Sequence, residues 1–357
     1  MSPVVAPATG LRGGAPGGCH LEAFPPLLAV PRPLGATTRG RRATHAAGPP
    51  GVFAYEQRGP GGAVRLRGLL LALAVDGGVL PHERTDPGVV RRTARLLTAR
   101  RYDRDPVMVL ATAGSVAPLL QETGAPLVDV VERHVRHVVR RVTGPDAVLA
   151  EQLGDLAAGP VVIADGHHRV AAAQRLAAEG RGDGRVLALL CDGEPGGPQV
   201  LPIGRCLPRW AFDDAVRDLA RRCTVTPMSP EEAVGALAGQ PGPAVAAVGG
   251  RGRAVLVTAP APSLLAGAPA VLRGLDVTLA DALVADRDPE LEFVHGPDAA
   301  TAAAAAGTGI CLVGRAVTPV QLAAAALAGV LLPRKATSFV PKPLGGVLLR
   351  GHGTAAG

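Results

Sequence analysis

One stretch, residues 161–170, constrains the fold more than any other part of the chain. It begins with an apolar, mostly β-branched run at residues 161–164, which follows a Gly-Pro pair and predicts a buried strand. Val170, Ala173 and Ala177 then recur at the spacing of one face of a helix. The sequence therefore predicts a strand, a tight turn and a helix in direct succession.

The turn between these two elements is crowded with polar side chains. Asp165 occupies the position of a helix N-cap, and Gly166 allows a sharp backbone turn and the close approach of a ligand. His167, His168 and Arg169 bring proton-bearing or cationic groups to the positive end of the helix dipole, where cations are unfavourable. A bound anion would relieve this arrangement, so we expect the turn to bind phosphate or carboxylate, with Asp165 as a base or a metal ligand. The alternative is a capped helix whose His and Arg side chains face water.

Length and cysteine usage place the chain in a broad class. At 357 residues it is long enough for two domains with a sizeable core. Its five cysteines are odd in number and never form a Cys-x-x-Cys pair, which favours a reducing compartment and implies no zinc or other metal site. No apolar run reaches the length of a membrane span or a signal peptide. We therefore expect a cytoplasmic protein without a membrane partner.

The charge balance points to a small ligand rather than to nucleic acid. The formal net charge is +7, from 37 Lys and Arg against 30 Asp and Glu, and most of the positive charge is Arg in a chain rich in Ala, Gly and Pro. Aromatic residues make up 2% of the chain, which argues against the stacking platforms of single-strand nucleic-acid binders. We expect a small anionic or phosphorylated substrate and no specific nucleic-acid partner.

Three regions follow one another along the chain. Residues 1–50 are rich in Pro and Gly and predict a loosely ordered lead-in with one short strand near residues 27–30. We expect residues 51–208 to form the catalytic core. Residues 209–357 predict a smaller C-terminal α/β unit with a basic, Pro-punctuated tail that could close over a site. Hairpins alternate with helices, so the expected fold class is mixed α/β, or α+β.

Individual elements can be assigned within these regions. We expect strands at residues 51–57, 64–75, 107–111, 186–191, 200–206, 244–248, 254–257, 291–295 and 309–313. We expect helices that begin at residues 86–87 or cover residues 145–156, 212–222, 230–238, 276–285 and 320–327. Residues 128–142 fit either a helix or a strand, because their valines recur at helical spacing while their density is typical of strands.

A second strand-to-helix loop, residues 81–85, carries His82, Glu83 and Thr85. These side chains project from the same edge of the core as Asp165 if their two strands are neighbours. In a transfer to a hydroxyl group, one carboxylate takes the hydroxyl proton while another group organises the phosphoryl donor. We assign Glu83 as the base and Asp165 as the organiser, and leave open both the reverse assignment and a plain surface ion pair of Glu83 with the neighbouring Arg.

Four segments carry a resemblance to known proteins. They are Pro81-His-Glu-Arg-Thr85, Ile163-Ala-Asp-Gly-His-His-Arg169, Leu201-Pro202 with Arg205, and Pro333-Arg-Lys-Ala-Thr-Ser-Phe-Val-Pro-Lys342. From Phe53 onward the chain resembles the bacterial and archaeal family called domain of unknown function 1015 (DUF1015). The Asp-Gly-His-His-Arg run also looks like the signature of ParB and sulfiredoxin-like folds, whose members include nucleotide-hydrolysing partition proteins and free serine kinases. The resemblance implies a ParB/sulfiredoxin-like core and phosphoryl chemistry.

The function implied by this resemblance is that of a small-molecule phosphotransferase or phosphohydrolase, similar to a kinase of free serine or of a related hydroxyl compound. ATP, ADP or pyrophosphate is the expected donor and Mg²⁺ the expected ion, without a Walker loop, since no Gly-x-x-x-x-Gly-Lys-Ser/Thr frame occurs. The competing prediction is a ParB-like nucleotide-binding regulatory or DNA-binding protein without metabolic turnover. That protein would need a helix-turn-helix with a basic recognition helix, whereas the predicted C-terminal helices are Ala-rich and neutral to acidic.

Each predicted site residue has an expected role. The expected catalytic residues are Glu83, Asp165 and His168. The expected phosphate-binding residues are Gly166, His167, Arg169 and Thr85. The candidates for substrate contact or for a lid are His82, Arg205, Lys335 and Lys342.

Overall fold

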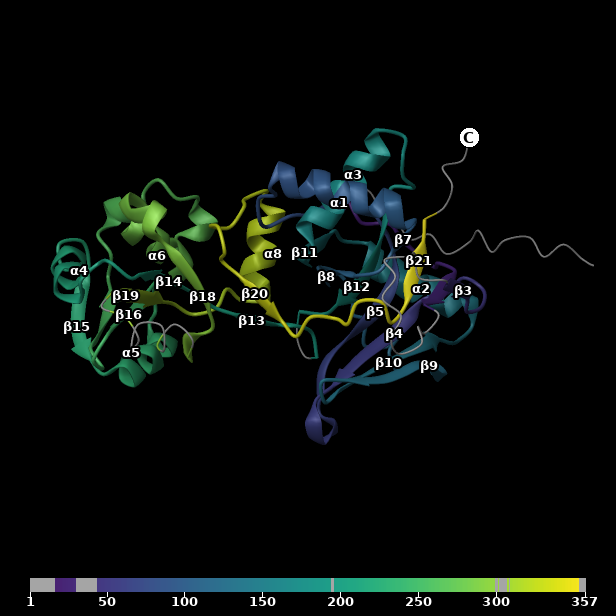
Figure 1. The fold of residues 1–357 in the computed structure, drawn as a ribbon, viewed down its shortest axis with the longest axis horizontal. Coiled ribbons are helices and arrows are strands. Elements are labelled where there is room, and N and C mark those ends of the chain that lie inside the picture. Colours follow the sequence, from purple (N-terminus) through teal and green to yellow (C-terminus); the bar gives the residue numbers. More distant parts are fainter. Residues whose placement is uncertain are drawn as a thin grey trace, which may run out of the picture. The chain divides into compact units, whose positions relative to one another are not determined.

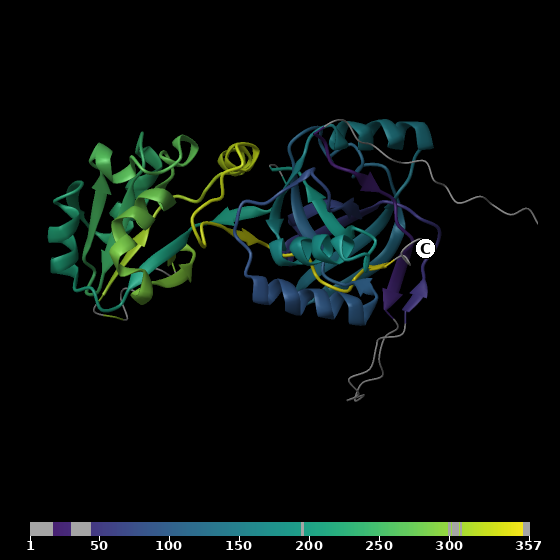
Figure 2. The ribbon, with the colours of Figure 1, turned by 90° about the horizontal axis from the view of Figure 1, so that it is seen from above.

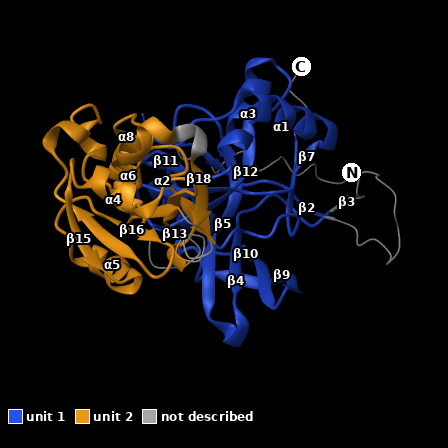
Figure 3. Cartoon of the chain, turned by 60° about the vertical axis from the view of Figure 1, so that its left-hand side comes forward, with its two compact units in different colours: residues 1–198, 341–357 blue, residues 199–340 orange. Residues whose placement is uncertain are grey.

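The computed structural model describes residues 17–352 apart from residues 30–43, 194–195, 299–300, 302–306 and 308. The chain forms two compact units (Figure 3): unit 1 comprises residues 1–198 and 341–357, and unit 2 comprises residues 199–340. The sequence suggested a boundary after residue 208 and a tail in the second unit. Residues 341–357 of that tail instead belong to unit 1, where its last described residues pair as a strand, and the part with Lys335 belongs to unit 2. Of the predicted lead-in, residues 1–16 and 30–43 lie outside the described residues.

A large mixed sheet forms the centre of unit 1 (Figure 1). Its strand order is β6-β11-β8-β12-β5-β4-β10-β9, and β1 pairs with β5. The strands are β1 Leu21–Glu22, β4 Phe53–Arg58, β5 Val64–Ala74, β6 Val79–Leu80, β8 Val107–Ala111, β9 Thr123–Glu132, β10 Val135–Val142, β11 Val161–Asp165 and β12 Arg185–Cys191. The predicted antiparallel hairpin of β4 and β5 is confirmed, with the short 3₁₀ helix η1 (Pro60–Gly62) at its turn.

Two helices cover this sheet because each offers it an apolar face, and a third packs on one of these two. The helices of unit 1 are α1 Pro87–Arg100, α2 Asp146–Ala157 and α3 His167–Ala178. Leu153 and Leu156 of α2 and Val170 of α3 are buried in the same core cluster as the central strands. Helix α1 runs alongside α3 (Figures 1 and 2), and small and aliphatic side chains of both helices form a separate buried cluster. Helix α3, and with it the turn at its start, is therefore fixed between the sheet and α1.

Residues 128–142, for which two assignments were open, lie in a β-hairpin. Strands β9 and β10 pair antiparallel around Arg133 and His134, whose φ angles are 49° and 65°. Positive φ at both turn residues is typical of the two-residue hairpin turn that matches the twist of the flanking strands. The valines occur here because β-branched side chains pack well on a pleated surface, and their helical spacing is incidental.

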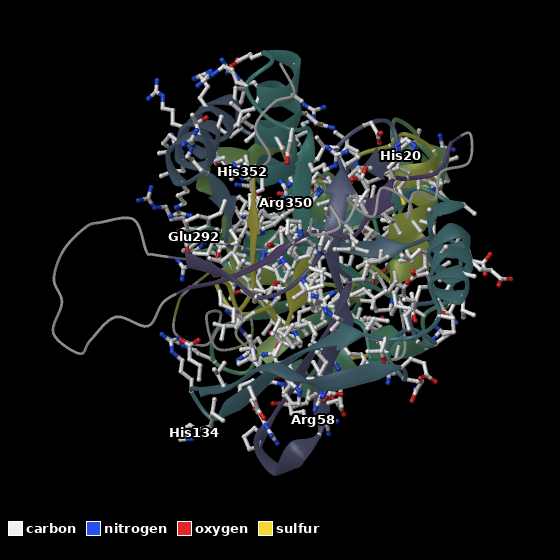
Figure 4. The ribbon with its side chains drawn as sticks, turned by 90° about the vertical axis from the view of Figure 1, so that its right-hand side faces the viewer. His20, Arg58, His134, Glu292, Arg350 and His352 are labelled. Atoms are coloured by element: carbon white, nitrogen blue, oxygen red, sulfur yellow. A yellow bond between two sulfur atoms is a disulfide. The ribbon has the colours of Figure 1, made fainter. Side chains whose placement is uncertain are left out.

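The C-terminal segment is anchored in a small second sheet of unit 1. The order of that sheet is β3-β2-β21-β7, with β2 Pro26–Ala29, β3 Thr44–Ala46, β7 Tyr102–Asp103 and β21 Leu349–Gly351. Arg350 is buried and donates to Asp103 at 2.8 Å and to Asp183 at 2.6 Å. His352, labelled with Arg350 in Figure 4, contacts the other oxygen of Asp103 through Nε2 at 2.9 Å. These paired buried charges hold the tail in place, since either partner alone would be costly to bury.

Unit 2 is built on an antiparallel sheet of order β15-β17-β16-β19-β14-β18, with β13 and β20 paired separately. Its strands are β13 Gln199–Leu201, β14 Ile203–Leu207, β15 Thr224–Met228, β16 Val245–Gly249, β17 Ala254–Thr258, β18 Glu292–His295, β19 Ile310–Val313 and β20 Ser338–Val340. Its helices are α4 Phe212–Leu219, α5 Pro230–Ala236, α6 Asp276–Val284 and α8 Pro319–Leu327, and its 3₁₀ helices are η2 Leu237–Gly239, η3 Pro262–Leu265, η4 Ala270–Leu272 and η5 Ala285–Glu290. The strand predicted at residues 200–206 is divided at Pro202, because proline cannot donate a ladder hydrogen bond.

The predicted mixed α/β class with a second α/β unit is confirmed by these elements. The narrower assignment to a ParB/sulfiredoxin-like core is compatible with them, and the name of the fold stays a prediction. Among the helices of the described residues, none has the length and hydropathy that crossing a membrane requires.

Cysteine pairing differs from what the sequence suggested. Cys206 of β14 lies opposite Cys311 of β19 in the antiparallel register, and the two form a disulfide. Cys19 and Cys191 are buried free thiols, and burial raises the pKa of Cys19 to about 11. Spacing along the chain could not reveal the disulfide, because 105 positions separate its two cysteines.

Candidate active site

Parallel pairing brings the two predicted loops to one edge of the sheet. Val79 and Leu80 of β6 lie opposite Val161 and Val162 of β11, and both strands run in the same direction. Their carboxyl ends therefore meet at the same edge, where β6 continues into residues 81–86 and β11 into the turn before α3. The condition under which Glu83 and Asp165 share an edge is met.

The turn depends on Gly166. This residue is the N-cap of α3 and has a φ of 105°, a conformation that L side chains rarely adopt. A Cβ at this position would also lie 2.8–3.0 Å from the guanidinium group of Arg169. The predicted N-cap role of Asp165 is wrong: Asp165 ends β11, and α3 has no side-chain cap. Its carboxylate contacts side-chain cations instead of the backbone.

Asp165 holds two cations. Its Oδ2 accepts a hydrogen bond from Arg169 at 2.8 Å, and its Oδ1 forms an ion pair with the ammonium group of Lys342. The Asp165 and Arg169 side chains are each about one quarter exposed, and Lys342 is 58% exposed. Two cations around one carboxylate leave a local excess of one positive charge, beside the positive end of the α3 dipole.

Arg169 is fixed by further contacts. Its Nη1 donates to the carbonyl oxygens of Asp105 at 2.5 Å and Pro106 at 2.6 Å. Its Nε makes no hydrogen bond with any described residue. The guanidinium is therefore held in one orientation by Asp165 and the loop before β8, and its Nε–H and one Nη2–H remain for a ligand.

His82 and His167 form a buried, uncharged pair. Their rings meet edge to face at 4.5 Å, and the His82 backbone N–H donates to His167 Nε2 at 3.3 Å. His82 Nδ1 donates to the carbonyl of Ile163 at 2.6 Å. Burial lowers the pKa of His82 to about 4 and, with the nearby positive charges, that of His167 to about 3. The sequence suggested cationic imidazoles at this helix start, whereas His167 is neutral at pH 7 because it is buried.

His168 holds the same loop in place at Asp86. Its Nε2 accepts a hydrogen bond from the backbone N–H of Asp86 at 3.0 Å. Asp86 in turn caps α1 by accepting from the Val89 N–H at 2.7 Å, which confirms its predicted N-cap role. Because both His167 and His168 accept through Nε2, each carries its proton on Nδ1 in this arrangement. The two imidazoles thus hold residues 82–86 against the start of α3.

Glu83 and Thr85 lie in this loop, and their side chains remain available for a ligand. Both side chains are partly exposed, and neither forms a hydrogen bond or an ion pair within the part of the chain that the structure describes. The surface ion pair of Glu83 with Arg84 that was kept as an alternative is not formed. Glu83 therefore presents a free carboxylate on the loop after β6, the strand that pairs with β11 and its terminal Asp165.

Arg205 and Lys335 belong to unit 2. Arg205 is 1% exposed, and it bonds the Asp281 carboxylate at 2.7 Å and the carbonyls of Ile203, Arg334 and Lys335. Lys335 has a φ of 54° and an exposed side chain. These contacts make Arg205 a buried support of the segment that contains Lys335.

Lysine is rare in this chain. The chain contains two lysines, Lys335 and Lys342, and every other basic side chain apart from histidine is Arg. A lysine ammonium is a compact charge that can rotate freely toward a phosphate, while Arg prefers a fixed planar geometry. The rarity of lysine in an Arg-biased chain singles out Lys342 without any structure.

Backbone N–H groups at the start of α3 add to the site. The N–H groups of His167 and His168, in the first turn of α3, donate no backbone hydrogen bond among the described residues. The described residues also contain no group of three or more His, Cys, Asp or Glu side chains arranged to hold a metal ion. The site thus offers N–H groups, an ammonium, a guanidinium and one free carboxylate.

A family model described as "Protein of unknown function (DUF1015)" matches residues 46–278, which is most of the chain and includes every site residue except Lys335 and Lys342. The chain belongs to the DUF1015 family. No curated protein matches it. Among solved structures, the DUF1015 chain is similar to free serine kinase in complex with AMP, with 15% identity, a TM-score of 0.41, and coverage of 76% of this chain and 87% of the other.

Two further solved structures are similar to this DUF1015 protein. A conserved hypothetical protein from Pyrococcus furiosus has 15% identity and a TM-score of 0.40, with coverage of 77% of this chain and 94% of the other. SbnI with a C-terminal truncation, from Staphylococcus aureus, has 13% identity and a TM-score of 0.44, with coverage of 77% and 85%.

Proposed function

We propose that unit 1 is a phosphotransferase that moves a phosphoryl group from a nucleotide or pyrophosphate donor to the hydroxyl group of a small acceptor, such as free serine or a related compound. The observation that carries this proposal is that the loop with the free Glu83 carboxylate and the turn with an excess of positive charge leave neighbouring parallel strands at one sheet edge. Phosphoryl transfer asks a protein mainly for positioning and charge neutralisation, and these groups supply both.

Glu83 is the general base in this proposal. Its carboxylate has no cation or N–H partner among the described residues, so it is available to accept the acceptor's hydroxyl proton. The hydroxyl oxygen then forms the new P–O bond, and the bond between the phosphoryl group and the donor breaks. Asp165 is less suited to be the base, because both of its oxygens are already engaged by cations.

Positive groups around Asp165 neutralise the donor. Lys342 and the Nε of Arg169 face negative oxygens, and the first N–H groups of α3 add the helix dipole. Asp165 positions the two cations, and its single negative charge leaves a net charge of plus one in this group. His167 and His168 act through residues 82–86, which they hold in place, and their Nδ1–H groups remain as donors toward phosphate.

The expected Mg²⁺ finds no suitable protein ligand in Asp165, because both of its oxygens already contact cations. Charge neutralisation is therefore assigned to Lys342, Arg169 and the helix N–H groups. The cytoplasm stays the proposed compartment, since nucleotide and pyrophosphate donors are found there.

The test is a product assay on the full-length protein. Phosphorus NMR would follow ATP, ADP and pyrophosphate, each with a panel of small hydroxyl compounds that includes free serine, in the presence and absence of Mg²⁺. A new phosphomonoester signal that depends on the acceptor supports a transferase, and release of phosphate without an acceptor supports a hydrolase. A donor that binds without any turnover would favour the ParB-like regulatory alternative and contradict the proposal.

A further inference from the structure

Unit 1 contains a cavity of about 750 Å³ whose lining includes none of the residues assigned to the active site. It lies between the first turns of α2, the end of β10 and the segment before β4. Its side chains Val52, Leu119, Val142 and Leu153 are buried and belong to the core cluster of the large sheet. The volume and the apolar walls are typical of small-molecule pockets, which carry only a few polar groups.

Arg141 brings a positive charge to this lining. Its Nη1 donates to the carbonyl oxygen of Pro50 at 3.0 Å and its Nη2 to that of Pro49 at 2.6 Å, and its Cζ lies 4.9 Å from the centre of the Phe53 ring. The Nε–H and one N–H on each terminal nitrogen form no hydrogen bond with a described residue. Neutral groups therefore fix the guanidinium, and three of its five N–H groups remain for a ligand.

No carboxylate of the described residues balances the charge of Arg141. The residue is partly buried and forms no ion pair there, and burial lowers the pKa of its guanidinium. Asp146 also lines the cavity, but it lies in the first turn of α2, where the helix dipole stabilises a carboxylate, and it does not pair with Arg141. Within residues 1–51 the sequence holds one acidic residue, Glu22, which pairs with Arg185. A partly buried cation without a counter-ion is unfavourable, and the anion of a ligand would relieve it.

Two glycines before β4 make room for the guanidinium. A Cβ on Gly51 would overlap with Nη1 of Arg141. Gly48 has a φ of 122°, a conformation that L side chains rarely adopt, and a Cβ there would lie 3.3 Å from Nη2 of Arg141. The segment of residues 48–51 thus fits closely around the guanidinium and holds it at the cavity, in a position that larger residues would not permit.

We propose that this cavity binds an amphipathic monocarboxylate, such as a medium-chain fatty acid. The carboxylate pairs with the N–H groups that Arg141 retains, and the alkyl chain packs against Val52, Leu119 and Leu153. A neutral apolar ligand would leave Arg141 without an anion, and an ammonium group would be repelled by it. A phosphate dianion would bring a second negative charge to a lining that has one cation and already contains Asp146.

Calorimetry with the full-length protein tests this assignment. The probes are octanoate, 1-octanol, octylamine, octyl phosphate and acetate, which vary the head group and the chain separately. We expect octanoate to bind. The alcohol and the amine should bind at least about tenfold more weakly because they lose the charge-assisted contact, and acetate because it loses the burial of the chain. Octyl phosphate should also bind more weakly than octanoate, since its second charge has no partner.

Arg141→Gln isolates the contribution of the charge, because the amide can still donate to the carbonyl oxygen of Pro50 but carries no charge. Its affinity for octanoate should fall at least about tenfold, while its affinity for 1-octanol stays the same. The matched control is Arg140→Gln. Arg140 is the neighbouring residue of β10 and does not line the cavity, so this variant should bind octanoate as the unmodified protein does.

Ala150→Trp tests the position of the chain without any change in the buried core. Ala150 is an exposed residue of α2 that lines the cavity, so an indole there should fill the space and weaken octanoate binding at least about tenfold. Ala178→Trp, at an exposed position of α3, is the matched control and should bind normally. Three results would overturn the proposal: no binding of octanoate up to about 10 mM, equal affinity for octanoate and 1-octanol, or unchanged octanoate affinity in both Arg141→Gln and Ala150→Trp.

Discussion

Lys342 forms an ion pair with Asp165 although 177 positions separate the two residues in the sequence. The contact exists because the C-terminal segment returns to unit 1, where β21 pairs with β2 and β7. It places an ammonium group beside the Arg169 guanidinium at the start of α3.

Lys342→Ala should lower turnover with little effect on stability. Removal of a charge-assisted contact to the donor costs about 1.5–3 kcal/mol, or roughly 10- to 100-fold in rate. The side chain is 58% exposed, so its ion pair contributes little to folding. Steady-state kinetics and a melting curve measure the two effects. The matched control is Arg217→Ala, which removes an exposed cation from an ion pair in unit 2 and should keep full activity. Equal loss in both variants would show that general charge, and not Lys342, matters.

Gly166→Ala should destabilise the protein by about 1–3 kcal/mol, because the residue has a φ of 105° and a new Cβ would press on Arg169. Gly154→Ala is the matched control: this glycine lies within α2, and a Cβ there meets no atom within 4 Å. The control should be neutral or stabilising by about 0.5–1 kcal/mol, since alanine favours helices. Urea denaturation measures both changes. Equal stability of the two variants would contradict the described turn.

Acid should destabilise the fold between pH 6.5 and 4 through His82 and His167. Their pKa values are lowered to about 4 and about 3, below the ordinary 6.5, so the unfolded chain binds protons that the folded chain refuses. Stability is therefore fully present above pH 6.5 and falls as the pH drops, by up to about 3 kcal/mol per pH unit when both groups take part.

His167→Gln isolates this effect, because the amide oxygen can still accept from the His82 N–H but does not titrate. The slope of unfolding free energy against pH between 6.5 and 4.5 should fall by about half. An unchanged slope would mean that His167 is not the buried neutral group described here.

Arg350→Met should cost about 3–5 kcal/mol of stability, because it leaves Asp103 buried without its cation. It should also lower turnover when the protein is still folded, since the tail that carries Lys342 loses its anchor. Denaturation and kinetics on the same preparation measure the two effects. A destabilised variant with normal turnover would contradict the claim that Arg350 keeps Lys342 in the site.

Local parts of the fold could be predicted from the sequence, because they depend on neighbouring residues. The strand, turn and helix of residues 161–178 follow from short-range apolar spacing, and the Asp86 cap follows from the Asp-Pro pair before α1. The strand-to-helix position of Glu83 was visible for the same reason. The sequence therefore suggested Glu83 as the base, and the structure added that its carboxylate has no partner among the described residues.

Relationships across the chain could not be predicted. The Lys342 contact, the Cys206–Cys311 disulfide and the pairing of His82 with His167 each join segments that only the tertiary fold brings together. The state of the imidazoles was also hidden, because their charge depends on burial and on which nitrogen accepts a hydrogen bond. Asp165 was misread as a cap, since spacing alone cannot show that its oxygens contact Arg169 and Lys342.

The most direct test of the proposed chemistry is the turnover of Glu83→Gln measured beside its affinity for the donor. The substitution removes the proton acceptor and keeps the shape of the side chain, and Glu151→Gln, at an exposed position of α2, is the matched control. We predict that Glu83→Gln binds the donor with nearly unchanged affinity and loses turnover by about 10²-fold or more, the usual contribution of a general base, while Glu151→Gln keeps full activity. Normal turnover in the Glu83→Gln protein would contradict the assignment of Glu83 as the base.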